Sequence, residues 1–148
     1  MDVYEILKED HKTVAELLKK LDKTSEDGTE KREKLFLELK TELTFHAYIE
    51  ELLFYPLLKD KKESKEITLE AYEEHRLVKT LLEELDDMSK DSEEWIGKFR
   101  VLKENVEHHV EEEEGELFEK ARNVLSAEDA TAIGARIATE KANLKASA

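Results

Sequence analysis

The 148-residue sequence contains no cysteine, and it has only one proline and four glycines. Without cysteine the chain can form no disulfide, no thiolate nucleophile, no cysteine-ligated zinc site and no iron–sulfur cluster. Because an all-β fold needs turn residues about every 8–12 positions, the scarcity of glycine and proline argues against one. Uninterrupted apolar runs are only a few residues long, so no helix is expected to span a membrane.

Basic residues are also in the minority, at 24 against 38 acidic residues, and the formal net charge is −14. This balance disfavours nucleic acid as a partner, because nucleic acid is bound by a basic face. The first residues, Met1 to Glu5, lack the basic and apolar regions of a secretory signal peptide. We therefore expect a soluble, cytoplasmic protein that binds neither nucleic acid nor membranes.

Glu, Lys, Leu and Ala, which favour helices, dominate the composition. Apolar residues recur at steps of three, four or seven, which is the period of amphipathic helices and argues against disorder. The pattern predicts four long helices, over about residues 2–23, 30–58, 64–88 and 92–122. A shorter, Ala-rich helix is expected after Ser126.

Short connections between four such helices predict an all-α fold, an up-down-up-down antiparallel four-helix bundle with a short C-terminal fifth helix. The bundle would occupy residues 1–125, and residues 126–148 would form an Ala-rich helical tail. The larger apolar residues of the tail are few, namely Ile133, Ile137 and Leu144. We therefore expect the tail to pack weakly or to fray at its end.

Four of the five histidines interrupt the apolar faces of the long helices, one on each helix. They are His11, His46, His75 and His109. Glu50 and Glu113 also lie on apolar faces, each four residues after a histidine, which places imidazole and carboxylate one turn apart on the same face. Any one of these histidines alone would be read as an ordinary core residue. Glutamate, however, is almost never buried without a partner, so the ordered set indicates a shared site.

Counted along the predicted helices at 1.5 Å per residue, the six side chains lie within about one turn of the same depth in an antiparallel bundle. Such a layer without a metal would leave several polar groups unpartnered in a dry core. Imidazole and carboxylate ligands without cysteine favour iron or manganese over a structural zinc ion, which is usually bound by cysteine. Six ligands are too many for one ion with an open coordination position, and they fit two ions bridged by carboxylates.

With these motifs the sequence resembles the hemerythrin-like, HHE cation-binding family over about residues 1–125. That family has a histidine on the first helix, His-x-x-x-Glu on the second, a histidine on the third and His-x-x-x-Glu on the fourth. The similar segments here are Asp10-His11-Lys12, His46-Ala47-Tyr48-Ile49-Glu50-Glu51, Leu53-Phe54-Tyr55-Pro56, Glu74-His75-Arg76, His108-His109-Val110-Glu111-Glu112-Glu113-Glu114 and Glu116-Leu117-Phe118. The resemblance implies a bundle that holds two non-haem iron ions joined by an oxo or hydroxo bridge, with manganese as the alternative metal.

The third helix departs from the oxygen-carrying hemerythrins, which have two histidines one turn apart there. Here Lys79, a poor ligand, follows His75 by one turn. With one histidine fewer, two octahedral ions would keep two open positions instead of the one that the carriers keep, so we expect a more open site. The candidates to fill an open position are His108, Tyr4 and Tyr72. The alternative for the two tyrosines is packing in the core with the hydroxyl outward.

The carboxylate ligand of the fourth helix has two candidates, Glu113 and Glu114. The apolar periodicity favours Glu113. The spacing to the following phenylalanine, compared with the second helix, favours Glu114, and Gly115 would permit a local bulge that presents it. Both residues are kept as candidate metal ligands.

The resemblance implies a protein that binds or reacts with O2, NO or peroxide, in oxygen or iron sensing or handling. The sequence does not decide whether such a protein is an enzyme, and it identifies no redox or signalling partner. The alternatives are an iron store or buffer, which would release iron readily, and a metal-free helical interaction module, whose stability would be indifferent to chelation.

Overall fold

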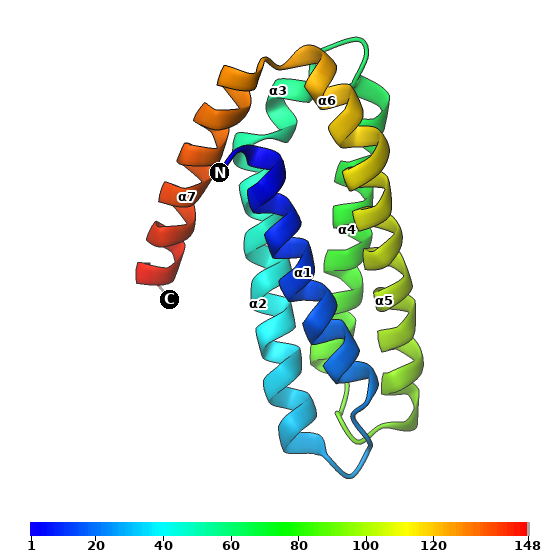
Figure 1. Ribbon diagram of the computed structural model, residues 1–148. Helices are drawn as coiled ribbons and strands as arrows, with labels where there is room; N and C mark the ends of the chain where they lie inside the picture. Colours follow the sequence, from blue (N-terminus) through cyan, green and yellow to red (C-terminus); the bar gives the residue numbers. More distant parts are fainter. Residues whose placement is uncertain (148) are drawn as a thin grey trace.

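Four long helices form the body of the molecule in a computed structural model that describes residues 1–147. They are α1 (Val3–Asp22), α2 (Thr29–Leu53), α4 (Lys65–Asp87) and α5 (Glu93–Glu112). Figure 1 shows that they run alternately in opposite directions along one long axis. Within residues 1–147 there is no β-strand, so the predicted all-α class is confirmed. None of the described helices is long and apolar enough to cross a membrane.

The prediction of one helix over residues 30–58 is wrong, because the chain breaks at Phe54. Helix α2 ends at Leu53, and a separate short helix, α3 (Tyr55–Lys59), follows at an angle at the top of the bundle (Figure 1). Pro56 explains the break, since proline has no N–H to continue the helix and its ring clashes with the carbonyl four residues earlier. The break matters for the site because it leaves the Tyr55 side chain fully buried in the bundle.

The predicted fourth helix is also interrupted. After α5 the chain makes one wider, π-helical turn, η1 (Glu113–Leu117), and continues as α6 (Phe118–Val124). The turn contains Gly115, where the sequence suggested a bulge. A π-helical turn inserts one residue into the helical register, so it changes which side chains face the core. Here it holds Glu113 buried while its neighbour Glu114 remains partly exposed.

The C-terminal helix α7 (Ala127–Ser147) is neither short nor weakly packed, contrary to expectation. It has 21 residues against 20 in α1, and it lies along the outside of α1 and α2 (Figure 1). Ile133 and Ile137 are buried in the contact. At Gly134 a Cβ atom would collide with the backbone of Met1 and Asp2, so the absence of a side chain permits the close approach.

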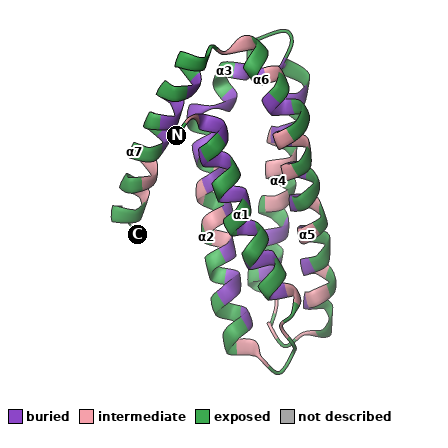
Figure 2. Ribbon diagram, in the orientation of Figure 1, coloured by how far each residue is buried: buried purple, intermediate pink, exposed green. Residues whose placement is uncertain are grey.

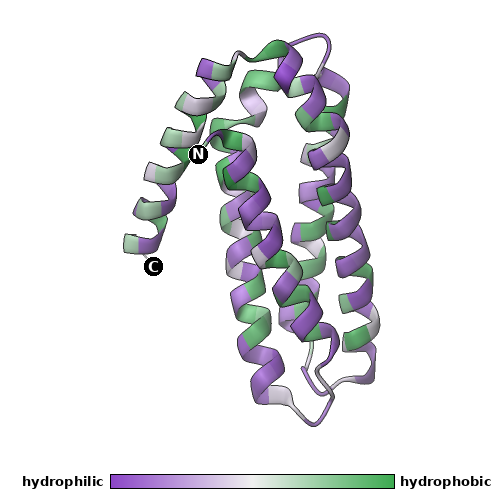
Figure 3. Ribbon diagram, viewed as in Figure 1, coloured by the Kyte–Doolittle hydropathy of each residue, from purple (hydrophilic) through white to green (hydrophobic). Residues whose placement is uncertain are grey.

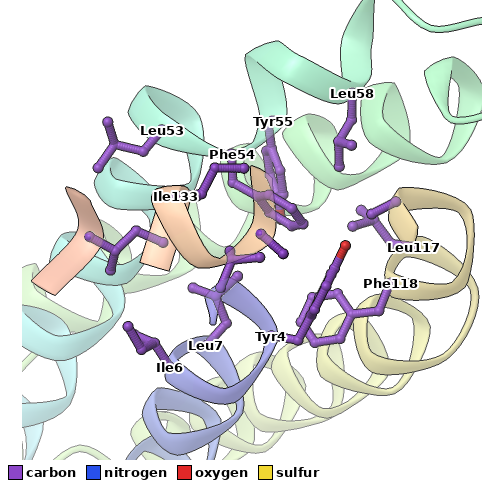
Figure 4. Close-up of a cluster of buried hydrophobic side chains, with 14 of the residues drawn as sticks. Tyr4, Ile6, Leu7, Leu53, Phe54, Tyr55, Leu58, Leu117, Phe118 and Ile133 are labelled. Carbon is purple, nitrogen blue, oxygen red and sulfur yellow. The ribbon is translucent and has the colours of Figure 1, made fainter. Parts of the chain in front are cut away.

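Two apolar clusters fill the core, and Figures 2 and 3 show the buried, apolar faces turned inward. The upper cluster joins α1, α2, α3, α4, η1, α6 and α7; in Figure 4 its aromatic residues Tyr4, Phe54 and Phe118 gather beside Leu7 and Ile133. The lower cluster packs around Trp95, Phe36 and Phe99; it also contains Val14, Leu43 and Val106. On α1, α2 and α4 the histidines His11, His46 and His75 fall between the segments that contribute to the two clusters. The polar layer is therefore sandwiched between two dry regions.

Candidate metal centre

Six of the seven predicted site residues meet in one layer of the bundle. Helix α1 contributes His11, α2 contributes His46 and Glu50, α4 contributes His75, α5 contributes His109, and η1 contributes Glu113. The two carboxylates are the most deeply buried members, with Glu50 at 0% and Glu113 at 1% exposure. Each α-helix supplies its side chains from the face that also packs the core, so helical periodicity brings the four histidines and Glu50 together, and the π-helical turn places Glu113 beside them.

The layer divides into two adjacent groups with a shared carboxylate. His11, His46, Glu50 and Glu113 place ligand atoms within 4.8 Å of one another, and so do Glu50, His75 and His109. Glu113 also reaches both groups. Its Oε1 lies 3.0 Å from His11 Nε2, and its Oε2 lies 3.4 Å from His109 Nε2. Two carboxylates that each touch both groups have the arrangement of bridging ligands between two cations.

Each of the four imidazoles has a carboxylate at its outer nitrogen. The Nδ1···O distances are 2.6 Å for His11–Glu114, 3.0 Å for His46–Asp10, 2.8 Å for His75–Glu51 and 2.6 Å for His109–Glu74. A carboxylate at Nδ1 holds the proton there and turns the Nε2 lone pair toward the centre of the layer. This is the usual support of a metal-ligating histidine, because it sets the tautomer and orients the ring.

Two buried atoms of the layer find no hydrogen-bond partner within residues 1–147. They are His46 Nε2 and Glu50 Oε2. His46 Nε2 lies 3.1 Å from Glu50 Oε1, but the direction does not suit a hydrogen bond. An unpartnered polar atom in a dry core is unfavourable by about 1–3 kcal/mol. Cations at the two positions would satisfy both atoms, so the residues present fit a pair of metal ions.

Protons compete with metal for these ligands. Burial by itself would lower the pKa of His109, but the Glu113 and Glu74 carboxylates raise it to about 10. Burial would raise the pKa of Glu113, but hydrogen bonding with Glu50 and the interactions with His109 and His11 bring it well below the ordinary value. In the metal-free protein His109 is therefore held as an imidazolium beside the Glu113 carboxylate, and a metal ion bound there would have to displace its proton.

Tyr55 is a site residue to which the sequence analysis assigned no role. Its hydroxyl donates to Glu113 and, at 3.2 Å, to Glu50 Oε1; it also lies 3.3 Å from His75 Nε2 and 3.5 Å from His109 Nε2. Burial raises the pKa of Tyr55 well above its ordinary value, and the two carboxylates raise it further, so the hydroxyl keeps its proton.

The inward position of Tyr55 could have been predicted from one feature of the sequence, the proline that follows it, Pro56. In an uninterrupted helix Tyr55 would point away from the face of Glu50, because five residues correspond to well over one turn. Only the break before Pro56 reverses this direction.

The remaining candidates lie away from the centre of the layer. Glu114 is the seventh predicted ligand; its side chain is 34% exposed and contacts only the outer nitrogen of His11. His108 is 66% exposed and pairs with Glu112 at 2.7 Å. Tyr4 packs against two phenylalanine rings in the upper cluster, and Tyr72 packs edge-on against Tyr55, with ring centroids 5.3 Å apart.

Comparisons with known proteins agree with this geometry. The chain is similar to a crystal structure of a hemerythrin HHE cation binding domain-containing protein from Mycobacterium kansasii, with a TM-score of 0.88 and 27% identity over 99% of this chain and 89% of that one. It is also 31% identical over 128 residues to a DNA nickase from Nostoc sp.. That match covers 86% of this chain but only 36% of the relative, so this chain spans about a third of the relative's length.

The sequence model of the hemerythrin HHE cation binding domain matches residues 2–121, from the start of α1 into α6. The matched region contains every histidine and glutamate of the buried layer. This chain therefore belongs to the hemerythrin HHE cation-binding family.

Proposed function

We propose that this protein holds two iron ions in the buried layer and binds or reacts with O2, NO or peroxide there, in oxygen or iron sensing or handling. Manganese is the alternative metal. The observation that supports the proposal is the uniform orientation of the four imidazoles, each with Nδ1 on a carboxylate and Nε2 turned inward beside two shared glutamates. A purely structural histidine has no need of this arrangement.

The residues divide into two ligand sets. His11 and His46 would hold one ion, His75 and His109 would hold the other, and Glu50 and Glu113 would bridge the pair. When bound, the metal pair supplies the binding and redox chemistry for a small oxygen- or nitrogen-containing ligand. The outer carboxylates keep the imidazoles oriented, and apolar clusters pack above and below the layer.

Tyr55 supplies the proton-bearing group at the layer. Its Oη lies among Glu50, Glu113, His75 and His109, and its raised pKa keeps the O–H intact at neutral pH. The hydroxyl is thus placed to donate a hydrogen bond to a small ligand that enters beside His75 and His109. When no such ligand is present, it donates to the two carboxylates.

Metal analysis together with an absorption spectrum of protein purified aerobically without chelator tests the proposal. We expect about two iron ions per chain, one for each ligand group, and the near-ultraviolet band of a bridged ferric pair. Anaerobic reduction followed by titration with NO and O2 should then change the spectrum. If the protein lacks metal, and anaerobic reconstitution with ferrous iron does not raise its melting temperature, the proposal is wrong.

The same titrations separate the alternatives. An iron store would bind iron, lose it readily to a chelator and show little reactivity toward NO or O2. A metal-free interaction module would have the same melting temperature with and without chelator, because a ligand stabilises only a fold that binds it.

The name of the Nostoc relative does not support a DNA-nicking activity for this chain. The chain spans 36% of that protein, and its own net charge is −14, which opposes binding to a polyanion.

A further inference from the structure

A cavity of about 680 Å³ lies beside the metal centre and reaches the surface between α2 and α4. All four imidazoles of the layer line it. A diatomic gas needs only about the volume of one water molecule, which is roughly 30 Å³ in the liquid. The cavity is instead in the size range of pockets that hold small organic molecules, roughly 300–1,000 Å³. The proposed function leaves this excess volume unexplained.

The walls of the cavity next to the imidazole layer are aliphatic. Each helix of the bundle contributes one aliphatic side chain three residues from its histidine: Val14 on α1, Leu43 on α2, Val78 on α4 and Val106 on α5. The aliphatic residue follows the histidine on α1 and α4, and it precedes the histidine on α2 and α5. Because the helices alternate in direction, all four side chains lie on the same side of the imidazoles, about one turn away.

The rim of the cavity carries charged side chains from α2 and α4. Two of its three cations are paired, Lys40 with Asp86 at 2.9 Å and Arg76 with Glu73. Lys79, the third, forms no ion pair with any residue from 1 to 147. It follows His75 by four residues and therefore lies on the same face of α4, one turn from the imidazole layer.

The carboxylates of the rim do not neutralise this position. Glu51 is engaged at His75 Nδ1, and Glu73 is engaged by Arg76. Glu83 follows Lys79 by four residues on the same face of α4, but the two side chains form no ion pair. The cation that is free to bind a ligand near the imidazole layer is thus Lys79.

We propose that the cavity binds an unbranched aliphatic monocarboxylate of medium chain length. The carboxylate lies toward the imidazole layer and Lys79, and the alkyl chain lies among Val14, Leu43, Val78 and Val106. Leu82, also in the wall, is seven residues beyond His75, which is about 10 Å along the axis and roughly the length of an eight-carbon chain. The proposal rests on the proposed function in one respect: open positions on the metal pair accept an oxygen donor.

Calorimetric titration of the iron-loaded full chain with acetate, butanoate, hexanoate and octanoate tests the proposal. We expect affinity to rise roughly three- to fourfold per added methylene, as for a CH2 group removed from water. Octanol, which has the same chain without the charge, should bind more weakly than octanoate. Equal affinities for acetate and octanoate, or for octanol and octanoate, would overturn it.

A cavity-filling variant locates the binding site. Val78→Phe should lower octanoate affinity at least tenfold and leave acetate binding unchanged, because it fills the aliphatic part of the cavity. Leu77→Phe is the matched control, since Leu77 is the adjacent residue and is 47% exposed. If circular dichroism shows that Val78→Phe does not fold, Val106→Phe on α5, at another of the four aliphatic side chains, serves the same purpose. Unchanged octanoate affinity in a folded cavity-filling variant contradicts the proposal.

The charge of Lys79 is tested separately. Lys79→Gln should weaken octanoate binding several-fold and leave octanol binding unchanged. Lys65→Gln makes the same charge change at the start of α4, away from the cavity, and should have no effect. Equal effects of the two substitutions would show that net charge, rather than the position of Lys79, determines affinity.

Iron content measured on the same samples separates this proposal from the proposed function. Iron binding without any chain-length dependence refutes the carboxylate site alone. Chain-length-dependent binding of octanoate by protein that takes up no iron supports the carboxylate site and refutes the iron centre.

Discussion

The two halves of the candidate metal centre have the same residue types but different surroundings. In the α1/α2 half, the Asp10 carboxylate behind His46 is buried and is held in turn by Lys141 of α7. In the α4/α5 half, the Glu51 carboxylate behind His75 is 41% exposed, and the Tyr55 hydroxyl lies among the ligands. The first half is braced by an additional helix, and the second contains the only tyrosine hydroxyl found at the layer within residues 1–147. This difference predicts that the first half retains metal and the second half controls reactivity.

Removing a carboxylate that serves both halves should have the largest effect. Glu113→Gln keeps the shape of the side chain but removes the charge that faces both His11 and His109. We expect the purified variant to lose most of its iron. Glu114→Gln is the matched control, because Glu114 touches only the outer nitrogen of His11; it should weaken iron binding about tenfold. Iron content by elemental analysis checks both variants, and a larger loss in Glu114→Gln would reverse the assignment of the two residues.

Removing one histidine should affect mainly one half. His46→Ala should reduce iron from about two ions per chain to about one, and it should shrink the difference in melting temperature between iron-loaded and metal-free protein. His108→Ala, at a residue that is 66% exposed, should do neither. Equal iron loss in the two variants would show that His46 and the buried layer have been wrongly assigned as the metal site.

Tyr55→Phe should change reactivity more than metal content. The variant loses the hydroxyl that donates to Glu50 and Glu113, but it keeps the ring that fills the upper cluster. We expect iron content near that of the unchanged protein and about a tenfold change in the rate at which the reduced protein reacts with peroxide, measured by stopped-flow absorbance. Tyr72→Phe is the control, because its ring packs on Tyr55 and, within residues 1–147, its hydroxyl forms no hydrogen bond with a residue of the layer. Identical rates in all three proteins would rule out a role for the Tyr55 hydroxyl.

Removing the ion pair between Lys141 of α7 and Asp10 should have the smallest effect on iron retention. Lys141→Met removes the ammonium group that pairs with Asp10 but keeps the length of the side chain. Because this group acts on His46 only through Asp10, we expect a two- to fivefold faster loss of iron to a competing chelator, less than for the direct partner of a ligand. Lys145→Met, one turn further along α7, should lose iron at the normal rate. If both variants behave like the unchanged protein, the bracing of the first half has no consequence for metal retention.

Helical periodicity predicted most of the fold and the layer. The steps between apolar residues located the four long helices, and the placement of His11, His46, His75 and His109 on the apolar faces required that they share a core. That these residues bind metal stays a prediction. These inferences came from local helix geometry, because side chains three or four residues apart share one face of a helix regardless of the tertiary structure.

Other features depended on interactions that periodicity does not contain. The position of Tyr55 follows from a break that a single proline causes, and the different orientations of Glu113 and Glu114 follow from one π-helical turn. The tight docking of α7 follows from Gly134, whose missing side chain lets two backbones approach. In each case one residue changes the direction of the chain or the distance between helices. The apolar periodicity of the segment does not predict that change.

The sequence by itself determined that this protein is a helical bundle with a polar layer of imidazoles and carboxylates, because those residues lie at helical spacing on faces that must be buried. Only the tertiary structure decided which carboxylates support the imidazoles, which hydroxyl joins them and where a cavity opens beside them. Those features arise between helices that are far apart in the chain, where packing, rather than local spacing, sets the distances.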